Sequence, residues 1–82
     1  MASDHYAEAR EIARTLEREG LTAEARLLVD AIDAGSTGTE ILMALRCHLQ
    51  RIEESESTPS SAVQRRICDL RLAIDDALGG RR

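Results

Sequence analysis

Aromatic side chains are almost absent from this chain of 82 residues, which contains one tyrosine, Tyr6, and no phenylalanine or tryptophan. This absence excludes an aromatic-lined ligand pocket and a platform for stacking nucleic-acid bases. A core must therefore come from aliphatic side chains. With 43% hydrophobic and 32% charged residues, the composition is that of a globular protein. The length allows one domain, residues 1–82, and excludes most large enzyme folds.

Lysine and asparagine are also missing, so all eleven cations are arginines, and fifteen acids give a net charge of -4. The lack of Lys, Asn and Phe beside abundant Ala indicates a GC-rich coding genome, which weakens any functional meaning of the arginine preference. Because phosphate neutralisation dominates affinity for nucleic acids, we expect no nucleic-acid partner. A basic protein is the more natural partner.

Long apolar runs are missing too. No stretch approaches the ~18 apolar residues of a membrane helix, and residues 1–5 show no basic region followed by an apolar run. Two cysteines are too few for a disulfide framework, and neither CxxC nor HxxxH spacing occurs. We therefore expect a cytoplasmic protein with reduced thiols, no membrane association, no metal and no cofactor.

Glycine, serine and proline divide the chain at Gly20, at 35–38 and at 55–60 into four segments of helical length. No segment alternates with period two, so the fold class is all-α. The predicted helices cover about residues 4–19, 22–34, 38–54 and 59–78, followed by a flexible tail at 79–82.

Candidate capping residues precede each helix. Thr22 is a plausible N-cap of the second helix. For the third helix, Thr37 and Glu40 have the form of a capping box, in which the Thr37 hydroxyl accepts from the Glu40 N–H and the Glu40 carboxylate accepts from the Thr37 N–H.

The first helix begins with Ser3 or Asp4 as its N-cap. For the fourth helix, Pro59 suits the first helical position, while Ser60 or Ser61 is an alternative cap.

Each predicted helix has one apolar side, with residues at the three-and-four spacing of a helical face. Short connections favour two antiparallel helical hairpins, which close most simply into an up-down-up-down four-helix bundle. A different arrangement of the hairpins is the structural alternative. The expected inner residues are Tyr6, Ala9, Ile12, Ala13, Leu16, Ala25, Leu28, Val29, Ile32, Ile41, Leu42, Leu45, Leu49, Ile52, Val63, Ile67, Leu70, Ile74 and Ala77.

Acidic residues collect at the C-terminal ends of the predicted helices, where the helix dipole disfavours an exposed acid by ~0.3 to 1 kcal/mol. Either solvent screens these charges, or a cationic partner docks on them. The candidate partner-binding residues are Glu17, Glu19, Asp30, Asp33, Glu53, Glu54 and Glu56.

Several apolar residues project away from the inner faces. If they cluster, they form an interaction or homodimer surface; if they are scattered, they need no explanation. The interface candidates are Leu27, Met43 and Leu72, and the other outward residues are Ala31, Cys47 and Cys68.

The only candidates for an enzyme or metal site are His48 and the two cysteines, Cys47 and Cys68. Cys47 and His48 are adjacent and point to different sides of a helix, so they do not chelate one ion easily. Cys68 matches Cys47 in height, but both lie off the apolar faces. Catalysis would need a nucleophile beside a base and an orienting acid, so the expected function is not enzymatic.

In size, acidity, four-helix pattern and its segment Glu53-Glu54-Ser55-Glu56, the chain resembles the small acidic helical immunity proteins that bacteria make against toxin domains. This resemblance implies an antitoxin-like protein that covers the cationic groove of a basic toxin domain. The near absence of aromatics departs from the tyrosine-rich surfaces of colicin immunity proteins. The alternatives are a homo-oligomeric helical scaffold or regulatory subunit, and a small metal- or thiol-dependent enzyme using Cys47, His48 and Cys68.

Overall fold

The structure is a computed structural model that describes residues 4–55 and 59–79. Within these residues the chain has four α-helices and no strand, which confirms the predicted all-α class. Glu56 and residues 80–82 of the predicted flexible tail lie outside the described residues. The helices are α1 (His5–Arg18), α2 (Thr22–Ala34), α3 (Gly38–Glu54) and α4 (Ser61–Ala77).

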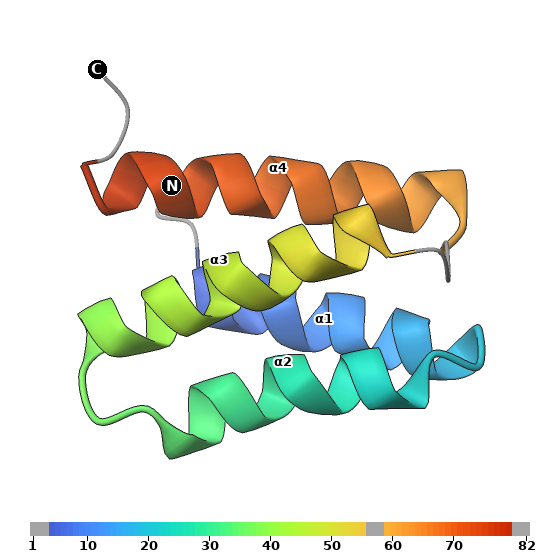
Figure 1. Ribbon diagram of the computed structural model, residues 1–82, viewed down its shortest axis with the longest axis horizontal. Coiled ribbons are helices and arrows are strands. Elements are labelled where there is room, and N and C mark those ends of the chain that lie inside the picture. Colours follow the sequence, from blue (N-terminus) through green and yellow to red (C-terminus); the bar gives the residue numbers. More distant parts are fainter. Residues whose placement is uncertain (1–3, 56–58, 80–82) are drawn as a thin grey trace.

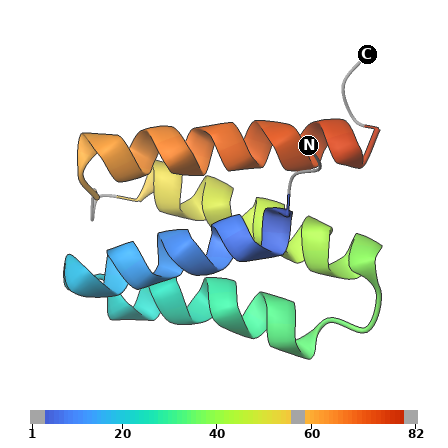
Figure 2. The same cartoon turned by 180° about the vertical axis from the view of Figure 1, so that it is seen from behind.

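The chain turns back after each helix, and every helix lies beside the next one in sequence (Figures 1 and 2). The last helix, α4, returns to pack on α1, so that α1 and α3 each contact both α2 and α4. None of the four described helices is long and apolar enough to span a bilayer.

The core is aliphatic, as the composition requires. No polar or charged side chain is buried among the described residues, and Tyr6 packs only partly against the core. The largest side chains that solvent does not reach come from all four helices, at the predicted three-and-four spacing. They are Ile12, Leu16, Leu28, Leu45, Leu49, Ile67 and Ile74.

Two predictions about the inner faces are wrong. Ala31 was expected to face outward, but it is only 8% exposed. Ala31 is covered because α2 packs against both α1 and α3. The buried residues of α2 therefore extend further around the helix than a single stripe. Ala77 was expected to face inward and is exposed, since it is the last residue of α4.

The connection from α1 to α2 explains why Thr22 is not an N-cap, contrary to the prediction. Gly20 adopts φ 85°, and its N–H donates to the Glu17 carbonyl, while the Leu21 N–H donates to the Leu16 carbonyl. These two bonds make a Schellman motif at the end of α1. Because Leu21 both completes this motif and precedes the first residue of α2, it occupies the N-cap position without a side-chain hydrogen bond.

The capping box of α3 forms with one change of partner. The Glu40 N–H donates to Thr37 Oγ1 at 3.1 Å, as predicted. The Glu40 carboxylate, however, accepts from the Ser36 N–H at 3.2 Å rather than from that of Thr37. This hydrogen bond from Ser36 to Glu40 joins the α2–α3 loop to the first turn of α3.

The alternatives for the first and fourth helices are also resolved. Asp4 caps α1, since its Oδ1 accepts from the backbone N–H groups of Tyr6 and Ala7. Ser60 caps α4, so the prediction of Pro59 as the first helical residue is wrong. Pro59 precedes the cap, where its carbonyl accepts a 2.7 Å hydrogen bond from the Gln64 side chain.

Candidate functional site

Glu19, a predicted partner-binding acid, makes a contact within the chain. Its Oε1 accepts a 2.9 Å hydrogen bond from the backbone N–H of Ser60, the N-cap of α4. This bond from the Ser60 backbone, and a second from the Ser60 side chain, lower the pKa of Glu19 from its usual 4.5. A carboxylate at a helix N-terminus also complements the dipole of α4. Glu19 therefore links the end of α1 to the start of α4.

Two more predicted acids are paired with arginines. Asp33, near the end of α2, lies 3.1 Å from Arg10 of α1. Glu53, near the end of α3, pairs with Arg71 of α4. Each of these two ion pairs joins two helices, and it neutralises part of the acid's charge within the chain.

The remaining predicted acids in the described residues are Glu17, Asp30 and Glu54, and all three are exposed. Glu54 accepts from the side-chain amide of Gln50 at 3.3 Å. None of the three has an arginine within ion-pair distance in the part of the chain that the structure describes.

Glu17 and Glu54 lie at the same end of the molecule, where α1 and α3 finish (Figures 1 and 2). Arg18 and Arg51 lie at this end as well, so it is a mixed surface with an acidic component. Asp30 is in the last turns of α2, at the opposite end.

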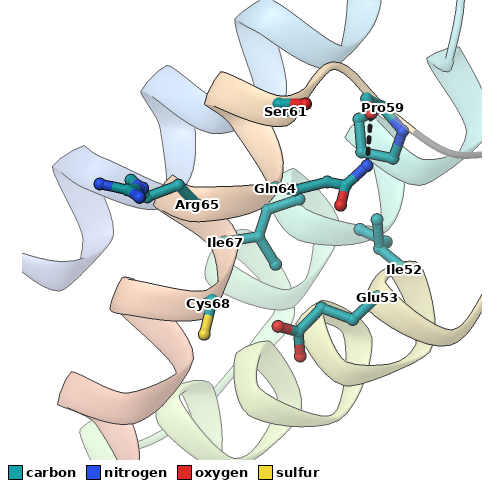
Figure 3. A pocket seen from close by; sticks show the side chains of 8 residues that line it. All are labelled: Ile52, Glu53, Pro59, Ser61, Gln64, Arg65, Ile67 and Cys68. Atoms are coloured by element: carbon teal, nitrogen blue, oxygen red, sulfur yellow. Dashed lines mark hydrogen bonds between the residues drawn. The ribbon is translucent and has the colours of Figure 1, made fainter.

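A groove of about 400 Å³ between α3 and α4 is a feature that the sequence did not predict (Figure 3). Ile52 and Ile67 lie at its centre, Glu53 extends from α3 toward α4, and Cys68 borders it from α4. The groove forms at the end where the α3–α4 connection joins the two helices. Periodicity finds the apolar positions of each helix, but it does not show how far apart two packed helices lie.

Ion pairs hold α3 and α4 together beside this groove. Arg46 of α3 lies 2.9 Å from Asp75 of α4, and Arg71 contacts both Glu53 and Asp75. The hydrogen bond with Glu53 is the largest cause of a raised pKa at Arg71, so this guanidinium stays charged. A further pair, Arg66 with Glu8 at 3.0 Å, joins α4 to α1.

The three apolar interface candidates are exposed by 41% at Leu27, 50% at Met43 and 50% at Leu72. They do not form one cluster. Leu27 borders a hollow with Arg51, near the end of α3, whereas Met43 lies eight residues earlier in that helix, ~12 Å along its axis. Met43 and Leu72, by contrast, lie on α3 and α4, which pack against each other.

The residues considered for chemistry remain separate. Cys47 is exposed, Cys68 is half-buried beside the groove, and both are free thiols. His48 is half-buried, and its Nδ1 atom is buried without a hydrogen-bond partner. Burial, with a smaller contribution from the charge of Arg51, lowers the pKa of His48 from 6.5, so the ring is neutral at pH 7. Within residues 4–55 and 59–79 no three His, Cys, Asp or Glu side chains gather as a metal site would require.

Comparison of the chain with protein-family models, with curated proteins and with solved structures gave no match.

Proposed function

We propose that this chain is a non-enzymatic protein-binding module of the immunity or antitoxin type, acting in the cytoplasm on a basic protein partner. Its helices form an up-down-up-down bundle of two antiparallel hairpins, which presents acidic side chains at fixed positions. Such a protein acts by steric and electrostatic cover of a cationic surface, such as the substrate groove of a toxin domain.

The observation that carries this proposal is the state of Glu17 and Glu54. Both are exposed at the same end of the molecule, and neither is paired with an arginine in the described part of the chain. Each stands close to a helix C-terminus, where the dipole makes a carboxylate unfavourable. A cationic partner would remove this cost, whereas Glu19, Asp33 and Glu53 already have partners within the chain.

The geometry gives less support to an enzyme. Cys47 and His48 are about 100° apart around α3, and one side chain is exposed while the other is half-buried. Cys68, on α4, borders the groove. A nucleophile needs its base within about 3 Å, and no hydrogen bond joins these three side chains among the described residues.

The proposal is tested by measuring binding to a basic protein encoded by the reading frame directly upstream. The purified pair is mixed in a calorimeter at low and at high salt. We expect Glu17→Arg and Glu54→Arg each to weaken the complex by about tenfold or more. We also expect wild-type affinity to fall with added salt, because exposed charges are screened.

Asp69→Arg is the matched control, since it reverses an exposed acid within α4 rather than at a helix C-terminus. The control should bind like the wild type, and circular dichroism should show unchanged helicity in all variants. Equal affinity of Glu17→Arg, Glu54→Arg and wild type would remove the acidic-end proposal, as would affinity independent of salt.

A second candidate function is a homo-oligomeric scaffold or regulatory subunit that buries Leu27, Met43 and Leu72 between copies. The exposure of all three side chains favours it. Because Leu27 is separated from the other two, a single interface does not bury all three. An obligate dimer whose mass is independent of concentration would favour this function over a monomeric binding module.

A further inference from the structure

We propose that the outer face of α3 and α4 binds the same face of a second copy of this chain, about a twofold axis parallel to the two helices. This dimer shares Glu54 with the proposed binding of a basic partner, whereas Glu17 on α1 belongs to that binding alone, so Glu17→Arg should leave the dimer unchanged.

The face consists of one stripe on each helix. On α3 the residues step by four, three and four, which places them on one side of the helix. On α4 they step by three and four. The α3 stripe is Met43, Cys47, Gln50 and Glu54, all exposed; the α4 stripe is Arg65, Cys68 and Leu72, of which Cys68 is half-buried and the others are exposed.

The ion pair between Arg46 and Asp75 sets the relative height of the stripes. Side chains in a helix lean toward its N-terminus, and α3 and α4 run in opposite directions (Figures 1 and 2). The two charged groups are 2.9 Å apart, so they meet within about one turn of Arg46 and of Asp75, on the N-terminal side of each. Met43 and Leu72 each precede these residues by three positions, so they lie within about one turn of the same height on the face.

The other members of the stripes follow in the same order. Cys47 is one turn beyond Met43 on α3, and Cys68 is one turn before Leu72 on the antiparallel α4, so the two cysteines also share a height. Glu54 and Arg65 lie at the end of the face that borders the groove. The face thus has an apolar part, a thiol part and a charged part, in matching order on both helices.

A twofold axis parallel to the helices places α3 of one copy over α4 of the other at unchanged height. Met43 then meets Leu72 of the second copy, Cys47 meets Cys68, and Glu54 meets Arg65. Apolar groups contact apolar groups, and the acid contacts a base that has no carboxylate partner in the described part of its own chain. Each contact occurs twice.

A twofold axis across the helices fits less well. When it crosses the middle of the face, it stacks α3 on α3 in the opposite direction, so Met43 faces Glu54 of the second copy and Leu72 faces Arg65. Apolar side chains would then be desolvated against charges. Charge and polarity therefore select the parallel axis.

The size of the face indicates a reversible dimer. Each helix has 17 residues and is ~25 Å long, and two adjacent helices are ~20 Å wide, so the two copies together bury ~1,000 Å². This area is at the lower end of specific interfaces. We therefore expect an association that depends on concentration.

Sedimentation equilibrium of the reduced protein is the first test. We expect a monomer–dimer equilibrium in wild type and at least a tenfold weaker association in Met43→Glu and Leu72→Glu. Leu27→Glu is the matched control, because it places the same charge on an exposed leucine of α2, away from the face, and should dimerise like wild type. A wild-type protein that stays monomeric into the millimolar range would overturn the proposal, and so would equal weakening by Leu27→Glu.

Disulfide trapping separates the two axes. Mild oxidation with diamide removes two electrons and two protons from a pair of thiols, and it links only cysteines whose Cα atoms come within about 7 Å. We expect a covalent dimer whose peptides join Cys47 to Cys68, and its loss in both Cys47→Ser and Cys68→Ser. A dimer that persists in Cys68→Ser through a link between two Cys47 residues would contradict the parallel axis.

A charge exchange tests the remaining contact. Glu54→Arg and Arg65→Glu should each weaken the dimer, and the double variant should restore it, because the opposite charges then face each other again. Additive weakening in the double variant would exclude the contact between Glu54 and Arg65.

Discussion

The carboxylate of Glu19, at the end of α1, accepts a hydrogen bond from the backbone N–H of Ser60, 41 residues later, at 2.9 Å. Ser60 is the N-cap of α4, and its hydroxyl accepts from the Val63 N–H. Two oxygens, one from a distant helix, thus satisfy N–H groups that the first turn of α4 leaves without helical partners. Through this contact the first hairpin fixes the start of the last helix.

We predict that Glu19→Ala and, to a smaller extent, Glu19→Gln lower the Tm at neutral pH. Alanine removes both the acceptor and the charge that opposes the dipole of α4, while glutamine keeps an acceptor. Thermal unfolding followed by circular dichroism measures the effect. Glu17→Gln is the control, since Glu17 is an exposed acid of the same helix end without such a bond, and it should not lower the Tm.

The stabilisation by Glu19 depends on pH in a defined direction. Its pKa is lowered in the folded state, so its contribution is complete above the unfolded pKa, near 4.5, and disappears as the pH falls through the folded pKa. We expect the difference in Tm between wild type and Glu19→Gln to shrink below pH 4.5. A difference that stays constant down to pH 2 would show that the charge is not responsible.

Gly35 is required by close packing rather than by its backbone angles, since its φ is -71°. A Cβ at this position would collide with Cγ1 of Ile41 and would lie 3.2 Å from the Ala31 carbonyl. We predict that Gly35→Ala lowers the free energy of unfolding by ~1–3 kcal/mol, the usual cost of overpacking. Urea denaturation measures the change.

Gly38→Ala is the matched control for this prediction. A Cβ there would meet only the Tyr6 hydroxyl at 3.3 Å, which is the end of a movable side chain, and alanine favours the helix that Gly38 begins. We expect a change within about 0.5 kcal/mol. If both alanine variants behaved alike, the collision with Ile41 would not be the cause.

The helices could be predicted from local signals because those signals lie within a few residues of one another. Gly20 at φ 85° and Gly79 at φ 73° end α1 and α4, and a glycine after an apolar stripe is visible in the sequence. The buried positions Leu45 and Leu49 likewise follow from helical spacing.

Local signals were insufficient where one residue serves two elements. Thr22 has the chemistry of an N-cap, but the hydrogen bond from the Leu21 N–H to the Leu16 carbonyl fixes where α2 begins. The Glu40 N–H donates to the Thr37 hydroxyl as expected. The Glu40 carboxylate accepts from the Ser36 N–H rather than from that of Thr37, because rotation about the Glu40 side chain brings both N–H groups within its reach.

The candidate site was less predictable than the fold. Acid placement treats Glu17, Glu53 and Glu54 alike, and it did not show that Glu53 pairs with Arg71, because that contact depends on how α3 and α4 approach each other. The groove between these helices depends on the same approach. Sequence spacing gives the direction of each side chain but not the distance between two helices.

The pair of Arg71 and Glu53 should contribute more to stability than an exposed pair. Their side chains are 25% and 23% exposed, so solvent screens them less than it does Arg14 and Glu11, which are 63% and 50% exposed. We predict a coupling of ~0.5–1 kcal/mol in a double-mutant cycle with alanine at both positions. The same cycle on Arg14 and Glu11 should give a smaller coupling that falls faster with salt, and the reverse order would contradict this ranking.

His48 should make the fold sensitive to mild acid. Its buried Nδ1 has no hydrogen-bond partner, and burial, then the nearby charge of Arg51, lowers its pKa in the folded state. When the pH falls below 6.5, the unfolded chain takes up the proton first, so stability decreases until the folded pKa is passed.

Replacing the His48 ring with leucine removes this proton uptake. We therefore predict that the free energy of unfolding decreases less from pH 7 to pH 5 in His48→Leu than in wild type. Urea denaturation at each pH measures this difference. His5→Gln, which removes the chain's other histidine, is the control and should follow the wild-type profile. An unchanged acid profile in His48→Leu would mean that the pKa of His48 is the same in the folded and unfolded chain, and would contradict this prediction.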